Sequence, residues 1–243
     1  MRAISAFGPM SISHVAKTTD LPRQTVSRIL FFLQDLGYVT RRPNDKRFSL
    51  TEYALALTSG AARDTWVSRI AVPAMETLCR DVLWPVALAE PRIPSMEILW
   101  DTNDISPLVI KPAPIGLKFP LLTSISGRTY LAFCAPEQRE TMIDAVLTES
   151  PDALDGIDLS RELLLGQLDE IAEQGFYCGH MPHKAHSSLA APVFDRSGVR
   201  AVVDIRFPLR SLSPNEATAR LAEPVTTCAG LISETLRLEQ RPG

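Results

Sequence analysis

The 243-residue sequence lacks any long apolar run. None of its apolar stretches approaches the roughly 18 residues that a membrane-spanning helix requires. The N-terminal stretch MRAISAFGPMS also lacks the apolar core of a signal peptide. These absences predict a cytoplasmic protein with no membrane partner.

Cysteine is scarce as well, and the four cysteines form no CxxC pair. They lie far apart in the sequence, at Cys79, Cys134, Cys178 and Cys228. This distribution fits reduced, buried thiols better than a disulfide framework.

The sequence has none of the motifs GxSxG, GxxxxGK, GxGxxG or HExxH that mark common catalytic and nucleotide sites. We therefore expect no enzymatic activity and no required cofactor. One stretch, CGHMPHKAH, leaves an alternative open, because zinc accepts both cysteine and histidine. Its candidate ligands are Cys178, His180, His183 and His186. They belong either to a metal-dependent enzyme or to a pocket mouth at which neutral histidines form hydrogen bonds.

The net charge of −3 conceals an asymmetry along the chain. Residues 1–50 hold eight basic residues against three aspartates, a charge of +5, so the remainder carries −8. A basic N-terminal module can neutralise DNA phosphates while an acidic remainder stays away from them. The asymmetry therefore favours a nucleic-acid partner for the N-terminal part alone.

The stretch LPRQTVSRILFFLQDLGYV, residues 21–39, predicts a helix that ends at Gly37. Pro22 suits the first turn, where a missing N–H costs nothing. One face is apolar, with Val26, Ile29, Leu30, Leu33 and Leu36. The opposite face carries Gln24, Ser27, Arg28 and Phe31.

Two flanking segments extend this pattern to a winged helix-turn-helix. Residues 11–20 predict a short amphipathic helix, followed by the turn Thr18 to Leu21. After Gly37 the sequence reads as a strand, a Pro-Asn-Asp turn and a second strand, which form a basic hairpin. The predicted DNA-binding residues are Arg23, Gln24, Thr25, Ser27 and Arg28 on the helix, and Arg41, Arg42, Lys46 and Arg47 in the wing.

The remaining sequence predicts a linker helix over residues 51–65 and an α+β domain over residues 66–243. Helices are expected at residues 66–82, with Pro73 as a kink or start, and at 126–134, 136–147, 160–174 and 214–238. The proline-rich residues 84–120 suggest edge strands and turns. Two strands joined by Asp-Arg-Ser-Gly predict a hairpin, in which one face of VRAVVDIRF packs against helices gathered on one side of an antiparallel sheet.

The order of these elements resembles the IclR family of bacterial transcriptional regulators. The likeness runs through LPRQTVSRIL, LGYV and FSLT, and continues through SISGRTYLAF (residues 124–133) and SLAAPVFDRSG (residues 188–198). Within that family, Trp84-Pro85 and residues 120–136 resemble the subgroup that activates the degradation of hydroxyphenylpropionate and related aromatic acids. The resemblance implies a GAF-like effector-binding domain with a ligand pocket on the sheet face away from the main helices.

The resemblance also implies where an effector would bind, namely at the SISGRT turn, at Ser188 and on the strand that carries Asp204 and Arg206. A hydroxyl at the helix start would leave free backbone N–H groups for a carboxylate, although a plain N-cap explains one serine equally well. The expected effector residues are Ser124, Ile125, Ser126, Gly127, His180, Ser188, Asp204 and Arg206.

The sequence as a whole predicts a transcriptional regulator whose DNA binding responds to a small molecule, an aromatic carboxylic acid or related catabolite. Its expected partners are double-stranded DNA with a pseudo-palindromic operator, a second copy in a homodimer or dimer of dimers, and RNA polymerase if it is an activator. A metal-dependent enzyme and a ligand-free architectural DNA-binding protein are the alternatives.

Overall fold

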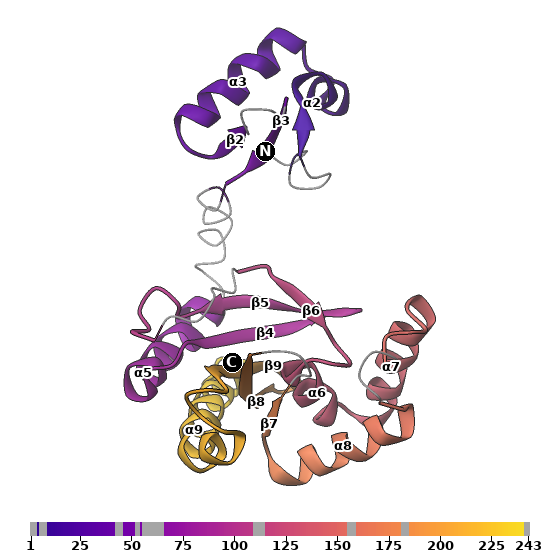
Figure 1. Ribbon diagram of the computed structural model, residues 1–243, viewed down its shortest axis with the longest axis vertical. Coiled ribbons are helices and arrows are strands. Elements are labelled where there is room, and N and C mark those ends of the chain that lie inside the picture. The colour runs from indigo at the N-terminus through magenta and orange to yellow at the C-terminus, as the bar shows by residue number, and fades with distance from the viewer. Residues whose placement is uncertain are drawn as a thin grey trace. The chain divides into compact units, whose positions relative to one another are not determined.

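The computed structural model describes residues 4, 9–41, 46–51, 54, 66–108, 115–154, 159–180 and 185–240 (Figure 1). The chain divides into two compact units, residues 1–63 and residues 64–243. Most of the expected linker helix, residues 51–65, lies outside the described residues. No helix in the described ranges is long and apolar enough to cross a membrane.

The first unit is the winged helix-turn-helix that the sequence predicts. Its elements are β1 (Met10–Ser11), α2 (Ile12–Thr19), α3 (Arg23–Asp35), β2 (Val39–Arg41) and β3 (Arg47–Leu50). The strands form an antiparallel sheet in the order β1-β3-β2. Ser11 starts α2, because its hydroxyl accepts a hydrogen bond from the His14 N–H at 3.3 Å.

Helix α3 buries a narrower apolar face than its sequence suggests. Val26 and Leu30 are buried at 2% exposure each, and Leu33 packs at the edge of the same core. Ile29 and Leu36, which share the apolar face in the sequence pattern, are 43% and 48% exposed. The small first unit has no further layer to cover that side of the helix among the described residues.

Helix α3 ends as predicted at Gly37. The Tyr38 N–H donates to the Leu33 carbonyl at 2.8 Å across a glycine with φ of 79°. Glycine adopts this left-handed conformation without a steric penalty. The turn leads the chain directly into β2, the first strand of the wing.

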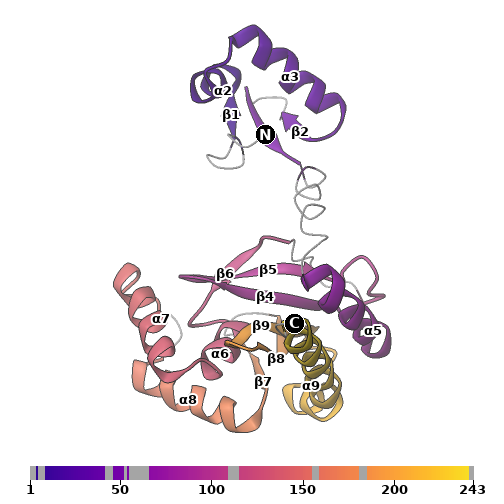
Figure 2. The ribbon, with the colours of Figure 1, turned by 180° about the vertical axis from the view of Figure 1, so that it is seen from behind.

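The second unit is built on a six-stranded antiparallel sheet with the order β6-β5-β4-β9-β8-β7 (Figure 2). Its strands are β4 (Val86–Arg92), β5 (Ser95–Asp101), β6 (Lys118–Pro120), β7 (Tyr177–His180), β8 (His186–Asp195) and β9 (Gly198–Pro208). Its helices are the π-helix Val67–Ala71, α5 (Val72–Val82), α6 (Ile125–Ala132), α7 (Pro136–Glu149), α8 (Arg161–Gln174) and α9 (Pro214–Glu239). The predicted helices and the β8–β9 hairpin are therefore confirmed.

Strands β4 and β5 occupy the middle of the sheet rather than its edge, which corrects the expectation for the proline-rich segment. Pro91 pairs with Met96 of β5, whereas pairing of β4 with β9 stops at Ala89. A missing N–H is tolerated at Pro91 because its other side has no partner strand there. Further along the proline-rich segment, residues 107 and 108 form a bend, and residues 109–114 lie outside the described residues.

Helices cover both faces of the sheet, not one face as the sequence suggested. Helices α5 and α9 pack against Ala201, Val203, Ile205 and Phe207 of β9. Helices α6, α7 and α8 form a second core with Val202. Strand β9 thus divides two cores, because successive side chains of a strand point to opposite faces.

Helix α6 approaches the preceding turn so closely that only glycine fits at position 127. A Cβ atom on Gly127 would lie 2.0 Å from the carbonyl oxygen of Leu121. Leu121 is fully buried, so its backbone cannot move aside without disturbing the core. The conformation of the SISG turn therefore depends on this glycine.

We predict that Gly127→Ala destabilises the second unit by about 1 to 3 kcal/mol, the usual cost of overpacking a filled site. The matched control is Gly230→Ala on α9, where nothing lies within 4 Å of the added Cβ. That change should stabilise the protein by up to about 1 kcal/mol, because alanine favours the helix. Urea unfolding of the full chain measures both, and equal stabilities would contradict the close approach.

Candidate nucleic-acid interface and effector face

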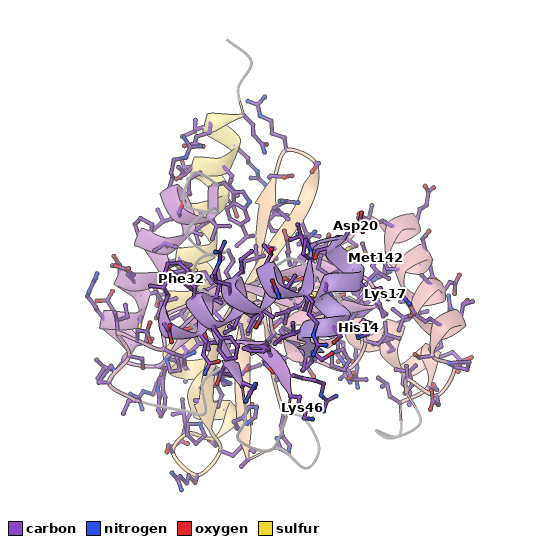
Figure 3. All side chains as sticks on the ribbon, turned by 90° about the horizontal axis from the view of Figure 1, so that it is seen from above. His14, Lys17, Asp20, Phe32, Lys46 and Met142 are labelled. Atoms are coloured by element: carbon purple, nitrogen blue, oxygen red, sulfur yellow. The ribbon has the colours of Figure 1, made fainter. Side chains whose placement is uncertain are left out.

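The outer face of α3 presents the predicted base-reading residues to solvent. Arg23, Gln24 and Arg28 are exposed, and Thr25 and Ser27 are half-buried. All five belong to the first two turns of the helix, the part of a recognition helix that enters the major groove. In Figure 3, Phe32 lies on one side of this unit, and His14 and Lys17 of α2 lie on the other, together with Asp20, which follows α2.

The wing is fixed to the recognition helix by an aromatic contact that the sequence analysis missed. Phe31 of α3 meets Phe48 of β3 edge to face, with ring centroids 5.7 Å apart. The Arg41 guanidinium lies over both rings, at 6.0 and 5.8 Å. The sequence pattern places Phe31 on the polar face of the helix and indicates no contact with the wing. Its aromatic character beside a basic hairpin was the available signal for this contact.

The other wing residues lie at the end of the hairpin. Lys46 and Arg47 are exposed, as a phosphate contact requires. Arg42 lies outside the described residues. The exposed residues of α3 and of the wing therefore supply both polar donors and positive charge, the two features of a DNA-binding surface.

The two serines of the SISGRT turn have different partners. Ser124 is the N-cap of α6, and its hydroxyl accepts a hydrogen bond from the Gly127 N–H at 3.1 Å. The hydroxyl of Ser126 instead donates to the Asp204 carboxylate at 2.9 Å. The N-cap interpretation thus accounts for Ser124, whereas Ser126 links the helix to β9.

Strand register places several polar residues on the same face of the sheet as Ser126. Asp101, Ala87, Asp204 and Ala190 form one row across β5, β4, β9 and β8. Ser188 and Arg206 form a neighbouring pair two residues along. We call the residues Asp101, Ser126, Ser188, Asp204 and Arg206 the Asp204 cluster.

Burial dominates the electrostatics of this cluster. It raises the pKa of the Asp204 carboxyl, although the Ser126 hydroxyl, Arg206 and the Ser188 hydroxyl lower it. Burial also raises the pKa of Asp101, and Arg206 is again among the groups that lower it. The Nε atom of Arg206 is buried and has no hydrogen-bond partner within the described part of the chain. One guanidinium thus lies near two carboxyls and keeps an unused donor.

Arg128 holds the turn in place, a role that the sequence did not reveal. Its Nε donates to the Leu122 carbonyl at 3.0 Å, and its Nη1 donates to the Gln167 side-chain oxygen at 3.0 Å. It therefore fastens α6 to α8. Two of the expected effector residues also serve packing, since Ile125 lies in the α6 core and Gly127 allows the close approach to Leu121.

Among the described zinc-ligand candidates, His186 pairs with Pro208 and lies on the same face of the sheet as Ser188, whereas His180 does not lie on the face of the Asp204 cluster. His180 pairs with Ser187, one residue out of phase with Ser188, so it lies on the opposite face of the sheet. The Cys178 thiol donates to the Pro214 carbonyl at 3.4 Å. His183 lies outside the described residues. Among the residues described, no group of three histidine, cysteine or acidic side chains could hold a metal ion.

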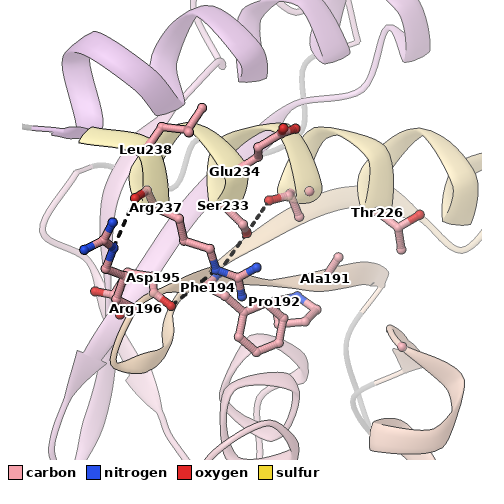
Figure 4. A pocket seen from close by; sticks show the side chains of 13 residues that line it. Ala191, Pro192, Phe194, Asp195, Arg196, Thr226, Ser233, Glu234, Arg237 and Leu238 are labelled. Carbon is pink, nitrogen blue, oxygen red and sulfur yellow. Dashed lines mark hydrogen bonds between the residues drawn. The ribbon is translucent and has the colours of Figure 1, made fainter. Parts of the chain in front are cut away.

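A separate pocket of about 890 Å³ lies between β8 and α9 (Figure 4). The Arg237 guanidinium stands over the Phe194 ring at 5.7 Å, and Ser233 accepts a hydrogen bond from the Phe194 N–H at 2.8 Å. Arg196 donates from Nε to the Arg237 carbonyl at 3.2 Å. None of the expected effector residues lines this pocket.

Comparison with known proteins agrees with the two units. Residues 61–234 match the family described as bacterial transcriptional regulator IclR, C-terminal, and residues 1–47 match the MarR family. A curated relative, the HTH-type transcriptional regulator KdgR of Escherichia coli, is 26% identical over 212 residues, which cover 86% of this chain and 79% of KdgR.

Solved structures share the fold. A transcriptional regulator from Rhodococcus sp. RHA1 superimposes with a TM-score of 0.70 at 21% identity, covering 95% of this chain and 91% of that one. An IclR homolog from Microbacterium hydrocarbonoxydans, solved in complex with 4-hydroxybenzoate, gives a TM-score of 0.59 at 20% identity, covering 95% and 92%. The relatives are transcriptional regulators, so the protein regulates transcription and is not an enzyme. By its winged helix and by the match over residues 61–234, the chain belongs to the IclR family of bacterial transcriptional regulators.

Proposed function

We propose that residues 1–50 bind a pseudo-palindromic operator and that a carboxylic acid, bound at the Asp204 cluster of the domain over residues 66–243, controls this binding. Residues 51–65 would connect the two activities. One winged helix reads only a half-site, so the protein would act as a homodimer or dimer of dimers. An activator of this design would also contact RNA polymerase.

The observation that carries the effector proposal is the buried, unpartnered Nε of Arg206 on a polar face of the sheet. Arginine binds a carboxylate through two parallel N–H donors, and Ser126 and Ser188 provide hydroxyls nearby. An aromatic acid is the favoured class, because the apolar neighbours of the α6 core could take a ring. The Microbacterium homolog in complex with 4-hydroxybenzoate supports this choice.

We propose that Gln24, Ser27 and Arg28 read base edges. Arg28→Ala should weaken binding to an operator selected from random DNA by about 1 to 3 kcal/mol, and should affect random DNA much less. Lys17→Ala on α2 is the control. Loss of an exposed lysine that contacts only phosphate would weaken binding to the operator and to random DNA equally. Fluorescence anisotropy with the two DNAs measures the difference. Equal losses for Arg28→Ala would make Arg28 a phosphate contact.

The wing should contribute through charge. Replacing Lys46 and Arg47 by alanine should lower the slope of log K against log salt by up to about 2, roughly one unit per lost phosphate contact. The same double substitution at Arg210 and Arg220, exposed residues of the second unit, should leave the slope unchanged. Salt titrations of the DNA complex provide the slopes. An unchanged slope in the wing variant would show that the hairpin is only solvated.

Arg206→Ala should weaken binding of 3-phenylpropionate and related acids roughly ten- to a hundredfold, because loss of a charged hydrogen-bond partner costs about 1.5 to 3 kcal/mol. Effector-free DNA binding should survive, since Arg206 belongs to the second unit. Calorimetric titration of the acids, with a DNA shift as control, tests both statements. Equal affinities in wild type and variant would remove Arg206 from the effector site.

A further inference from the structure

The Asp204 carboxylate is a hydrogen-bond acceptor. It lies on a face of the sheet whose other polar groups suit an anion. An ionised carboxylate offers about four acceptor positions. The Ser126 hydroxyl occupies one of them at 2.9 Å, and the Ser188 hydroxyl lies close enough to lower the pKa of the group. A ligand that brings a donor would need one of the remaining positions.

The charges of the cluster argue against a ligand that is only a carboxylate. Arg206 supplies one positive charge, while Asp101 and Asp204 supply two carboxyls near it. A carboxylate bound to Arg206 would therefore also face these two acids, and the repulsion would offset part of its attraction to the guanidinium. If the ligand donated a hydrogen bond to Asp204, this carboxylate would attract the ligand through that bond instead of only repelling it.

The spacing of the two side chains indicates where that donor must be. Asp204 and Arg206 are two residues apart on β9 and point to the same face, with Cα atoms about 6.6 Å apart. The Arg206 guanidinium also lies close enough to Asp204 to lower the pKa of that carboxyl, so we expect the groups that the two side chains bind to lie close together in the ligand. A hydroxyl on the carbon next to the carboxylate meets this condition, and a hydroxyl at the far end of an aromatic ring does not.

We propose that Asp204 determines effector specificity by accepting a hydrogen bond from a hydroxyl adjacent to the effector's carboxylate, so that the preferred effectors are 2-hydroxy acids. This inference rests on the proposed effector site. Asp204 and Arg206 together recognise the hydroxyl-carboxylate pair, and Ser126 orients the Asp204 carboxylate from α6. The rest of the ligand would lie against the half-buried Ala87 of the same row.

The test compares acids that differ by this one hydroxyl. Calorimetry with the full chain should show that 3-phenyllactate binds at least roughly tenfold more tightly than 3-phenylpropionate, and mandelate more tightly than phenylacetate, as a hydrogen bond to a charged group predicts. Asp204→Ala should abolish the preference, because it removes the acceptor for the hydroxyl of the hydroxy acids and also the repulsion that weakens binding of the plain acids. Asp204→Asn should keep part of it, because the amide oxygen still accepts. Asp152→Asn, at an exposed aspartate outside the cluster, should change nothing.

The outcomes separate this inference from the proposed function. Equal affinities of the paired acids for wild type, or a preference that survives Asp204→Ala, would overturn the role of Asp204. If Arg206→Ala still abolished binding in that case, the effector site itself would stand. Failure of every acid to bind wild type, or binding that ignores Arg206→Ala, would overturn the proposed site and the inference together.

A stability measurement shows whether the variants fold. Burial raises the pKa of Asp204, so the folded state holds its proton to higher pH than the unfolded state does. Stability contributed by that proton is complete below the unfolded pKa near 3.8 and is lost as pH rises through the folded value. Asp204→Asn should therefore melt at least as high as wild type at neutral pH. The higher melting temperature of Asp204→Asn should approach that of wild type toward pH 4, because wild-type Asp204 then also becomes neutral. The neighbours Asp101 and Arg206 are the same in both proteins.

Discussion

The alternation of side chains along β9 is the constraint on which the second unit depends. Ala201, Val203, Ile205 and Phe207 point into the core with α5 and α9, and each is fully buried. This anchoring fixes the strand in register between β4 and β8. The intervening residues of β9 must then point to the opposite face, toward α6. Asp204 and Arg206 are among these intervening residues.

Helix α6 places a further polar side chain, Ser126, against this face of β9. Its start is fixed by the Ser124 cap, by the close approach of Gly127 to Leu121, and by the Arg128 bonds to the preceding turn and to α8. With the helix so placed, Ser126 reaches Asp204 across the interface. The contacts of Ser124, Gly127 and Arg128 therefore determine the position of the Ser126 hydroxyl, which donates to Asp204. Burial raises the pKa of the Asp204 carboxyl, so its ionised form is disfavoured in this position.

In the winged helix, too, the residues that pack the core differ from those that are exposed on the proposed DNA-binding surface. Two buried residues of α3, Val26 and Leu30, hold it against the small core. Phe31 and Phe48 then bring the wing against the helix, and Arg41 covers both rings. Of the other basic residues, those that the structure describes are exposed, namely Lys17, Arg23, Arg28, Lys46 and Arg47. The charge of residues 1–50 is thus concentrated on a surface whose shape is fixed by aromatic contacts.

The sequence by itself determined the elements whose signals are local. Periodicity predicted α3 and the later helices, Gly37 marked the end of α3, and Asp-Arg-Ser-Gly marked the β8–β9 turn. The charge asymmetry and the resemblance pointed to a DNA-binding regulator. These features depend on neighbouring residues and on composition, so they can be read along the chain.

Contacts between distant residues were decided only by the tertiary structure. The sequence could not show that β4 and β5 are internal, that helices cover both faces, or that Ile29 and Leu36 remain exposed, because each depends on which element packs beside them. It named Ser124, Ser126, Asp204 and Arg206 as a set but could not assign the cap to Ser124 and the link to Asp204 to Ser126. It also grouped His180 with them, whereas strand pairing puts His180 on the other face, since a shift of one residue reverses the direction of a side chain.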